Sequence, residues 1–437
     1  MRSLALRLAI PLAFAAAAPA VAAAPTGERT DWVDAKTGHR IHVISDAPGN
    51  YALYFNYNAY TPNGDTMIFQ TRDGISRLDM KSWKVTTLLK RPGAHVLFAG
   101  HKTRSAYFSE QAAGDANAPI TIYAADIDTG AVRLIAKVPK GSRIDTINAD
   151  ETLLAGQVAE RDMPLQPSAG PPVGGMTAYA ANWPDGTPMT YADAKEYRLN
   201  QRLDARIPME IFTLNVKTGE RRSVLTATDW LNHLQFSPTD PTLLMYCHEG
   251  PWHKVDRIWT IRTDGTQMTK VHARTMNMEI AGHEFWSPDG KTIWYDLQRP
   301  RGESFWLAGY DVATGKRTQY HLERNQWSVH YNVSADQKIF SGDGGDSEMV
   351  ARAPDAKWLY LFKPQTIPDV AGIHADNAAS LIASGRMDEE KIVDFGKQDY
   401  KLEPNARFSP DGKWLIFRAN IEGKTKIYAA EVAKAAR

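Results

Sequence analysis

The stretch Trp286-Ser-Pro-Asp-Gly-Lys-Thr-Ile-Trp-Tyr295 decides the fold, because its pattern recurs along the chain. A turn rich in Pro, Asp, Gly or Asn is followed by a short apolar run typical of a β-strand. Seven copies of this pattern lie at residues 61–69, 99–108, 148–156, 236–246, 286–295, 333–341 and 408–417. Such regular repetition indicates a structure built from equivalent units.

A second hairpin follows most copies, with turns such as Asp128-Thr-Gly130 and Ala313-Thr-Gly315 between β-rich runs. Hairpins at this spacing predict four-stranded blades repeated around an axis. We therefore expect an all-β protein, a seven-bladed β-propeller. The strand at residues 40–45 precedes the first copy and is predicted to complete the last blade, which would close the ring.

Two intervals between copies are longer than the rest and predict insertions at about residues 157–207 and 344–400. The first includes a helix-like segment at 191–203. Long loops on a propeller usually project from one face and shape a pocket. Residues 25–437 are expected to form a single propeller domain.

The N-terminus has the layout of a secretory signal peptide over residues 1–24: a basic start, a short apolar run and a small-residue cleavage region. The protein is therefore expected in the periplasm or secreted, with no membrane span after cleavage. Removing these residues takes away two arginines and no acidic residue, so 51 basic residues become 49 against 50 acidic ones. This balance gives no support for nucleic-acid binding.

Several classes of site lack sequence support. Cys247 is the only cysteine, which excludes an internal disulfide and a zinc thiolate cluster. The chain has no G-x-S-x-G elbow, no phosphate loop and no H-E-x-x-H motif, so serine hydrolases, nucleotide enzymes and zinc proteases lose their usual signatures.

The candidate catalytic residues are His283 and Arg257. His283 immediately precedes the turn of the fifth copy, where a neutral imidazole at the inner end of a strand can accept a proton near pH 7. Arg257 lies at a strand entry, and a guanidinium can hold a carboxylate through two parallel hydrogen bonds. The alternatives are a histidine bonded to a neighbouring blade and an arginine paired with Asp256 or Glu249.

His233, His248 and Trp252 are candidate substrate-binding residues around the same strands. Trp252 has the type of side chain that stacks on a sugar ring, although packing is its alternative role.

His330 precedes the sixth copy as His283 precedes the fifth. The matching place before the seventh copy holds Tyr400, Glu403 and Asn405, and Glu403 and Asn405 face the same way on an extended strand. One imidazole and two oxygens predict a site for Mn²⁺ or Ca²⁺. A hydrogen-bonded channel network is the alternative.

These motifs resemble those of the oligogalacturonate lyase family, whose members are seven-bladed propellers. The resemblance rests on Leu231-Asn-His233, Cys247-His-Glu-Gly-Pro251, Val255-Asp-Arg257-Ile-Trp259, His283-Glu-Phe-Trp286 and Gly342-Asp-Gly344. It implies β-elimination on short uronate oligomers, with His283 as the base, Arg257 as the charge-stabilising arginine and His330 as one ligand of Mn²⁺.

The last blade departs from the family pattern, which has Gln-x-x-His-x-His where this chain has Tyr400-x-x-Glu403-x-Asn405. Either Glu403 and Asn405 rebuild a harder oxygen site, or a protein cation or a protonated tyrosine takes the role of the ion. Tyr400 is in addition a candidate to bind substrate and help the leaving group. The signal peptide is a second departure, since the family works largely in the cytoplasm.

The sequence thus predicts a lyase that cleaves uronate oligosaccharides by β-elimination. The alternative is a non-catalytic periplasmic propeller that binds or scaffolds, because Ser-Pro-Asp-Gly-Lys repeats also occur in scaffold propellers. A concentration of His248, Arg257, His283 and His330 at one face favours the enzyme.

Overall fold

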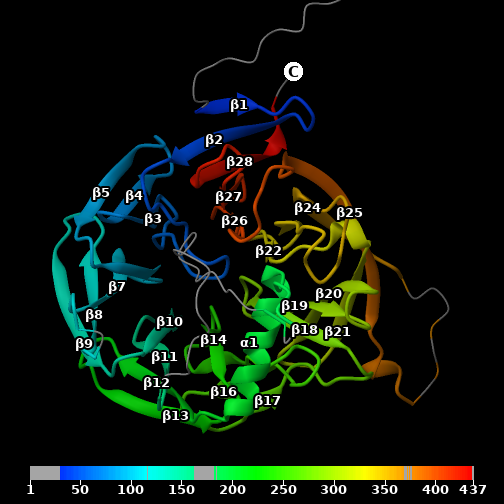
Figure 1. Ribbon diagram of the computed structural model, residues 1–437, viewed down its shortest axis with the longest axis horizontal. Coiled ribbons are helices and arrows are strands. Elements are labelled where there is room, and N and C mark those ends of the chain that lie inside the picture. Colours follow the sequence, from blue (N-terminus) through cyan, green and yellow to red (C-terminus); the bar gives the residue numbers. More distant parts are fainter. Residues whose placement is uncertain are drawn as a thin grey trace, which may run out of the picture.

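The computed structural model describes residues 30–115, 117–161, 182–183, 185–368, 372, 374 and 376–435. The predicted signal peptide at residues 1–24 lies outside the described residues. The strands form seven antiparallel blades around a ring (Figure 1). The prediction of an all-β, seven-bladed propeller is confirmed.

Blades 1 to 4 each use consecutive strands, and the earliest strand of blades 3 and 4 lies nearest the ring centre (Figure 1). Their strands are β3 (Thr66–Thr71), β4 (Gly74–Asp79) and β5 (Val85–Lys90); β6 (His95–Ala99), β7 (Ser105–Gln111), β8 (Ile120–Asp126) and β9 (Val132–Val138); β10 (Arg143–Ile147), β11 (Leu153–Ala159), β12 (Met209–Asn215) and β13 (Arg221–Ala227); and β14 (Leu231–Phe236), β15 (Leu243–His248), β16 (Ile258–Arg262) and β17 (Thr269–Lys270).

Blades 5 and 6 are joined into one eight-stranded sheet, because their outer strands β21 and β25 pair in parallel. Blade 5 contains β18 (Ile280–Trp286), β19 (Thr292–Gln298), β20 (Phe305–Asp311) and β21 (Arg317–Leu322), and blade 6 contains β22 (Tyr331–Val333), β23 (Phe340–Gly342), β24 (Trp358–Thr366) and β25 (Ala383–Asp394). Short 3₁₀ helices lie at Arg324–Gln326 and Ala378–Ser380.

Blade 7 closes the ring with strands from both ends of the chain. The C-terminal strands β26 (Arg407–Phe408), β27 (Trp414–Ala419) and β28 (Lys426–Lys434) are continued by the N-terminal strands β2 (His39–Ser45) and β1 (Asp31–Val33). The closing strand predicted at 40–45 is β2, which pairs with β28. That prediction is confirmed.

The repeated turns hold their shape through side-chain hydrogen bonds. In the fifth copy, Ser287 Oγ donates to Asp289 at 2.7 Å and accepts from the Thr292 amide at 2.9 Å. Gly290 has a φ of 69°, which favours glycine. Ser409 and Asp411 repeat the first of these bonds in the seventh copy at 2.6 Å. The recurring Ser-Pro-Asp-Gly therefore encodes the connection between the first two strands of a blade.

The two predicted insertions have different structures. The first leaves blade 3 between β11 and β12 and carries the helix α1 (Tyr191–Ala205), which agrees with the helix-like segment at 191–203. Residues 162–181 and 184 within it lie outside the described part of the chain. The interval 344–400 contains the paired strands β24 and β25 of blade 6 itself, which have 9 and 12 residues. Across the described ranges, no helix is long and apolar enough to cross a membrane.

Candidate active site

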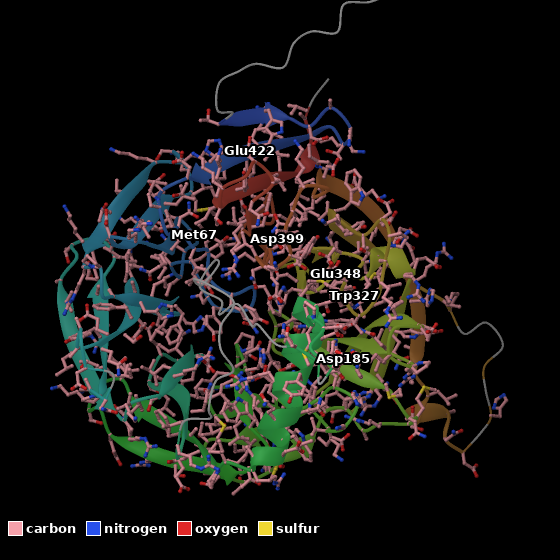
Figure 2. The ribbon with its side chains drawn as sticks, viewed as in Figure 1. Met67, Asp185, Trp327, Glu348, Asp399 and Glu422 are labelled. Atoms are coloured by element: carbon pink, nitrogen blue, oxygen red, sulfur yellow. The ribbon has the colours of Figure 1, made fainter. Side chains whose placement is uncertain are left out.

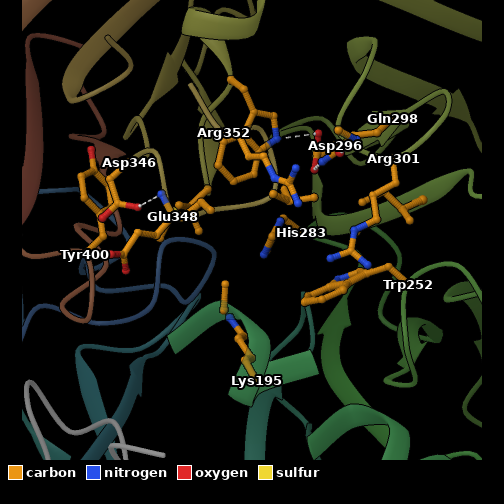
Figure 3. A pocket seen from close by; sticks show the side chains of 18 of the residues that line it. Lys195, Trp252, His283, Asp296, Gln298, Arg301, Asp346, Glu348, Arg352 and Tyr400 are labelled. Atoms are coloured by element: carbon orange, nitrogen blue, oxygen red, sulfur yellow. Dashed lines mark hydrogen bonds between the residues drawn. The ribbon is translucent and has the colours of Figure 1, made fainter. Parts of the chain in front are cut away.

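A cavity of about 750 Å³ is lined by α1, by Trp252 from the loop between β15 and β16 of blade 4, and by residues of blades 5 and 6 and of the segment before β26. Figure 2 places Trp327, Glu348 and Asp399 around the same region, and all three line the cavity. Figure 3 shows Lys195, Trp252, His283 and Tyr400 in its wall. Four separate segments of the chain therefore line one cavity.

The inner strands of two blades bulge where a candidate residue lies. In β18 the pairing with β19 skips between Gly282 and Phe285, and His283 has a φ of 51°. In β14 the same irregularity contains His233, with a φ of 52°. Non-glycine residues seldom adopt positive φ, and bulges next to active sites re-aim side chains. The bulge in β18 presents His283 to the cavity.

His283 is held in its neutral form. Burial lowers the pKa of its imidazole well below 6.5, and the nearby His330, Lys195, Arg257 and His233 lower it further. Its buried Nδ1 has no hydrogen-bond partner among the described residues. A neutral imidazole in a cavity can accept a proton at neutral pH.

His330 is fixed by a buried network rather than exposed to solvent. Its Nδ1 lies 2.9 Å from Asp343 Oδ2, its Nε2 lies 3.2 Å from the Tyr54 hydroxyl, and the same Nε2 is 3.7 Å from Glu403 Oε2. The ring is 2% exposed. The structure thus brings together His330 and Glu403 as the sequence predicts, within the channel network that was the alternative to a metal.

Arg257 lies directly behind Gly282 of the cavity wall. Its Nη1 donates to the Gly250 carbonyl at 2.9 Å, and its guanidinium lies over the Trp252 ring at 5.7 Å. The buried Nε has no hydrogen-bond partner in the described part of the chain. A Cβ at position 282 would lie only 3.6 Å from that Nε, so the glycine keeps the approach from the cavity open. The alternative pairing of Arg257 with Asp256 is not seen: the Asp256 carboxylate lies at Lys270 and Arg274.

The predicted substrate-binding residues separate into two groups. Trp252 and Tyr400 line the cavity, although the Tyr400 hydroxyl already donates to the Asp343 carbonyl at 2.9 Å. His233 and His248 are not among the residues that line it. His233 lies 3.5 Å from Glu249, and His248 packs against Tyr246 and Trp259. Sequence proximity suggested one cluster, but neither histidine lines the cavity that His283 lines.

The three predicted metal ligands do not by themselves make a metal site. Glu403 Oε1 lies 3.3 Å from the ammonium group of Lys195, and Asn405 donates through Nδ2 to the Glu403 carbonyl at 3.0 Å. No cluster of three His, Cys, Asp or Glu side chains suited to a metal occurs within the described ranges. Because a lysine ammonium stands against the one carboxylate of the set, these residues do not fit a divalent ion as they are arranged.

The sequence did not single out three cavity residues that the fold contributes. Lys195 comes from α1, Arg301 follows β19, and Asp296 lies in β19. Asp296 is 3% exposed and accepts hydrogen bonds from Trp327 Nε1 at 3.2 Å and Gln298 Nε2 at 3.1 Å. Burial raises the pKa of its carboxyl to about 7. None of these residues belongs to a repeated motif, so no local signal marks them.

Comparison with known proteins agrees with this architecture. The profile of the family described as oligogalacturonate lyase matches residues 193–436, more than half of the chain. This chain belongs to the oligogalacturonate lyase family. The matched region includes every candidate catalytic, substrate-binding and metal-ligating residue considered above.

Two relatives in the family are each a little over a quarter identical to this chain across the residues that align. The oligogalacturonate lyase of Dickeya dadantii is 27% identical over 229 residues, which are 51% of this chain and 55% of that protein. The oligogalacturonide lyase of Pectobacterium atrosepticum is 28% identical over 239 residues, with the same coverage. The chain thus spans about half the length of the relatives it matches.

Solved structures of the family share the fold over nearly the whole chain. An oligogalacturonate lyase in complex with manganese has a TM-score of 0.69 at 21% identity, covering 92% of this chain and 96% of its own. The oligogalacturonate lyase of Vibrio parahaemolyticus has a TM-score of 0.69 at 19% identity, covering 93% and 97%.

Proposed function

We propose that this member of the oligogalacturonate lyase family cleaves uronate oligosaccharides of the oligogalacturonate type by β-elimination. The observation that carries the proposal is the neutral His283, presented to the cavity by a strand bulge with Arg257 behind the adjacent Gly282. Family membership supports a lyase acting on pectin-derived oligosaccharides.

The chemistry begins at C5 of the uronate. Its proton is hard to remove because the adjacent carboxylate resists further negative charge. The role of Arg257 is to neutralise that carboxylate, since positioned charges are usually the largest contribution to such catalysis. His283 then takes the C5 proton, for which its nitrogen must approach the carbon to about 3 Å.

The elimination is completed when the C4–O bond breaks. The electrons of the C5–H bond form the C4=C5 double bond, and the departing oxygen takes a proton. Water and the Tyr400 hydroxyl were the two predicted sources of that proton, but the Tyr400 hydroxyl already donates to the Asp343 carbonyl and the residue is only 1% exposed. Water from the open cavity is the proton source that this arrangement favours.

A divalent cofactor is consistent with the solved relative in complex with manganese. The contact between Lys195 and Glu403 does not fit such an ion, so no step above depends on one.

The purified protein should be incubated with fragments of oligogalacturonate, glucuronan, alginate, ulvan and rhamnogalacturonan, and the ultraviolet absorbance of the unsaturated product followed. Absorbance on oligogalacturonate supports the proposal. Binding of a uronate without absorbance on any fragment would instead favour the non-catalytic propeller.

The predicted periplasmic or secreted location is likewise a proposal, and it rests on residues 1–24. N-terminal sequencing of the protein recovered from the periplasm or medium tests it. A mature chain that still begins at Met1 would contradict it.

A further inference from the structure

The helix α1 brings a lysine from blade 3 into the cavity lined by residues of blades 5 and 6 and of the segment before β26. Figure 3 shows Lys195 projecting from α1 into the cavity that His283 lines. The Lys195 ammonium lies 3.3 Å from Glu403 Oε1, on the segment that precedes β26. Residues about 200 positions apart in the chain therefore form one ion pair in the cavity wall.

The position of Lys195 is fixed by its neighbours on the helix. Glu196 forms two hydrogen bonds to Arg301, at 2.7 and 2.6 Å, and Arg202 reaches Glu249 at 2.8 Å. Ala194 and Leu199 are each 2% exposed. Bidentate arginine pairs add geometric specificity, so α1 is docked as a fixed part of the wall.

The charge of Lys195 acts on both sides of the cavity. The Lys195 ammonium lies 3.3 Å from Glu403 Oε1, and the other carboxylate oxygen of Glu403 lies 3.7 Å from His330 Nε2. Lys195 also helps to lower the pKa of His283. In such a partly desolvated space a cation interacts more strongly with neighbouring charges than it does in water.

We propose that the Lys195 ammonium binds the carboxylate of the uronate being cleaved, beside His330 and Glu403, and supplies with Arg257 the positive charge that the elimination needs. An ammonium has three donor hydrogens, so one group can bond Glu403 and a substrate carboxylate together. This inference rests on the proposed lyase function. It assigns to a protein cation the role that the sequence predicted for a divalent ion.

The first test compares Lys195→Met with Lys254→Met. Lys254 contacts Asn200 of the same helix at 2.6 Å and does not line the cavity, so its loss controls for loosening of α1. We expect kcat/KM to fall on the order of 10²-fold in Lys195→Met and to stay near wild type in Lys254→Met. Equal losses in both variants would overturn the proposal.

Chemical rescue separates charge from structure. In Lys195→Cys, alkylation with 2-bromoethylamine forms a new C–S bond and releases bromide, which gives a side chain of lysine length ending in an ammonium. The native Cys247 is buried, so alkylated wild type is the control. We expect most of the lost kcat/KM to return. No recovery after complete alkylation would contradict the charge role.

The pH profile gives an independent readout. The charged and titratable groups around His283 are His330, Lys195, Arg257 and His233. Losing one positive charge makes protonation of His283 easier, so the acid limb of kcat/KM should move to higher pH in Lys195→Met. An unmoved acid limb would show that Lys195 does not act on the base.

Binding and metal measurements distinguish this proposal from the proposed function. Calorimetry of digalacturonate with His283→Asn protein should show affinity at least tenfold weaker when Lys195→Met is added, and unchanged affinity would overturn the role of Lys195. Wild-type activity should resist a chelator. Loss in chelator that Mn²⁺ restores would overturn Lys195 as the cation and leave the lyase function standing, whereas inactivity on all uronates would refute the lyase function itself.

Discussion

The imidazole rings of His283 and His330 lie against each other, with centroids 5.2 Å apart and planes at 78°, although they belong to neighbouring blades. A proton added to either ring would face the other ring and the nearby cations. The contact explains in part why the pKa of His283 is lowered, after the larger effect of burial.

The first prediction concerns the pH dependence of turnover. A base with the ordinary histidine pKa of about 6.5 would lose roughly tenfold in kcat/KM between pH 8 and pH 5.5. Because the pKa of His283 is lowered well below 6.5, we expect its neutral form to persist and kcat/KM to change less than about twofold over that range. Steady-state rates in buffers of constant ionic strength test this. A midpoint near 6.5 would contradict the assignment of His283.

The second prediction concerns the base itself. The residue at 283 must adopt positive φ, which asparagine tolerates better than alanine, and Asn405 already does so with a φ of 56°. We expect His283→Asn to fold normally and to lose on the order of 10³-fold in kcat. Circular dichroism and thermal unfolding establish folding, and His321→Asn on the outer strand β21 serves as the control. A variant with near wild-type kcat would exclude His283 as the base.

The third prediction concerns access to Arg257. A methyl group at position 282 meets Trp252 at 3.4 Å and Arg257 Nε at 3.6 Å, which are ordinary contacts, so Gly282→Ala should keep its stability. The methyl group would nevertheless lie between the cavity and the buried guanidinium. We expect kcat/KM to fall at least tenfold, measured with oligogalacturonate, while the melting temperature stays within a few degrees. Full activity would show that Arg257 does not reach the substrate past Gly282.

The fourth prediction concerns stability and Asp296. Its pKa is about 7 when folded and about 3.8 when unfolded, so the folded state binds more protons between these values. The stabilisation that protonated Asp296 gives is fully present below pH 3.8. It is lost as the pH rises from 3.8 to about 7, and above that pH the free energy of unfolding no longer depends on this group. The difference between the two pKa values corresponds to a loss of about 4 kcal/mol in the free energy of unfolding between low and high pH.

Asp296→Asn removes this titration. We expect the free energy of unfolding of the variant, relative to wild type, to rise as pH increases from 4 to 8, and denaturant unfolding at several pH values measures it. Asp264→Asn, in an exposed turn, is the control. A difference between variant and wild type that does not change with pH would show that Asp296 titrates normally.

The sequence predicts the fold well because the determinants are local. Each Ser-Pro-Asp-Gly turn closes its own hydrogen bonds within about five residues, as Ser287 does with Asp289 and Thr292. The closing strand was predictable from local sequence too. Residues 40–45 have the pattern of a strand, but they precede the first copy and so belong to none of the seven repeated units. The interval 344–400 contains β24 and β25, of 9 and 12 residues, and strands of that length lengthen the interval between two copies in the same way as an insertion.

The candidate site is only partly predictable, because it depends on where blades meet. His283 and His330 could be aligned by their equivalent places before a turn. Lys195 could not, since α1 reaches the cavity only through tertiary contacts such as Glu196 with Arg301. The positive φ of His283 likewise occurs in a bulge that composition does not reveal, and proximity in sequence does not reveal that His248 lies outside the cavity lining.

The pairing of β2 with β28 makes the two ends of the chain a single seam. If the segment His39–Ser45 were removed, the backbone groups of β28 would form an open sheet edge, which readily pairs with strands of other molecules. Shortened versions of the protein that begin beyond Ser45 would therefore tend to exchange strands and assemble into linked rings or chains. A purification tag belongs before β1, where it leaves the seam intact.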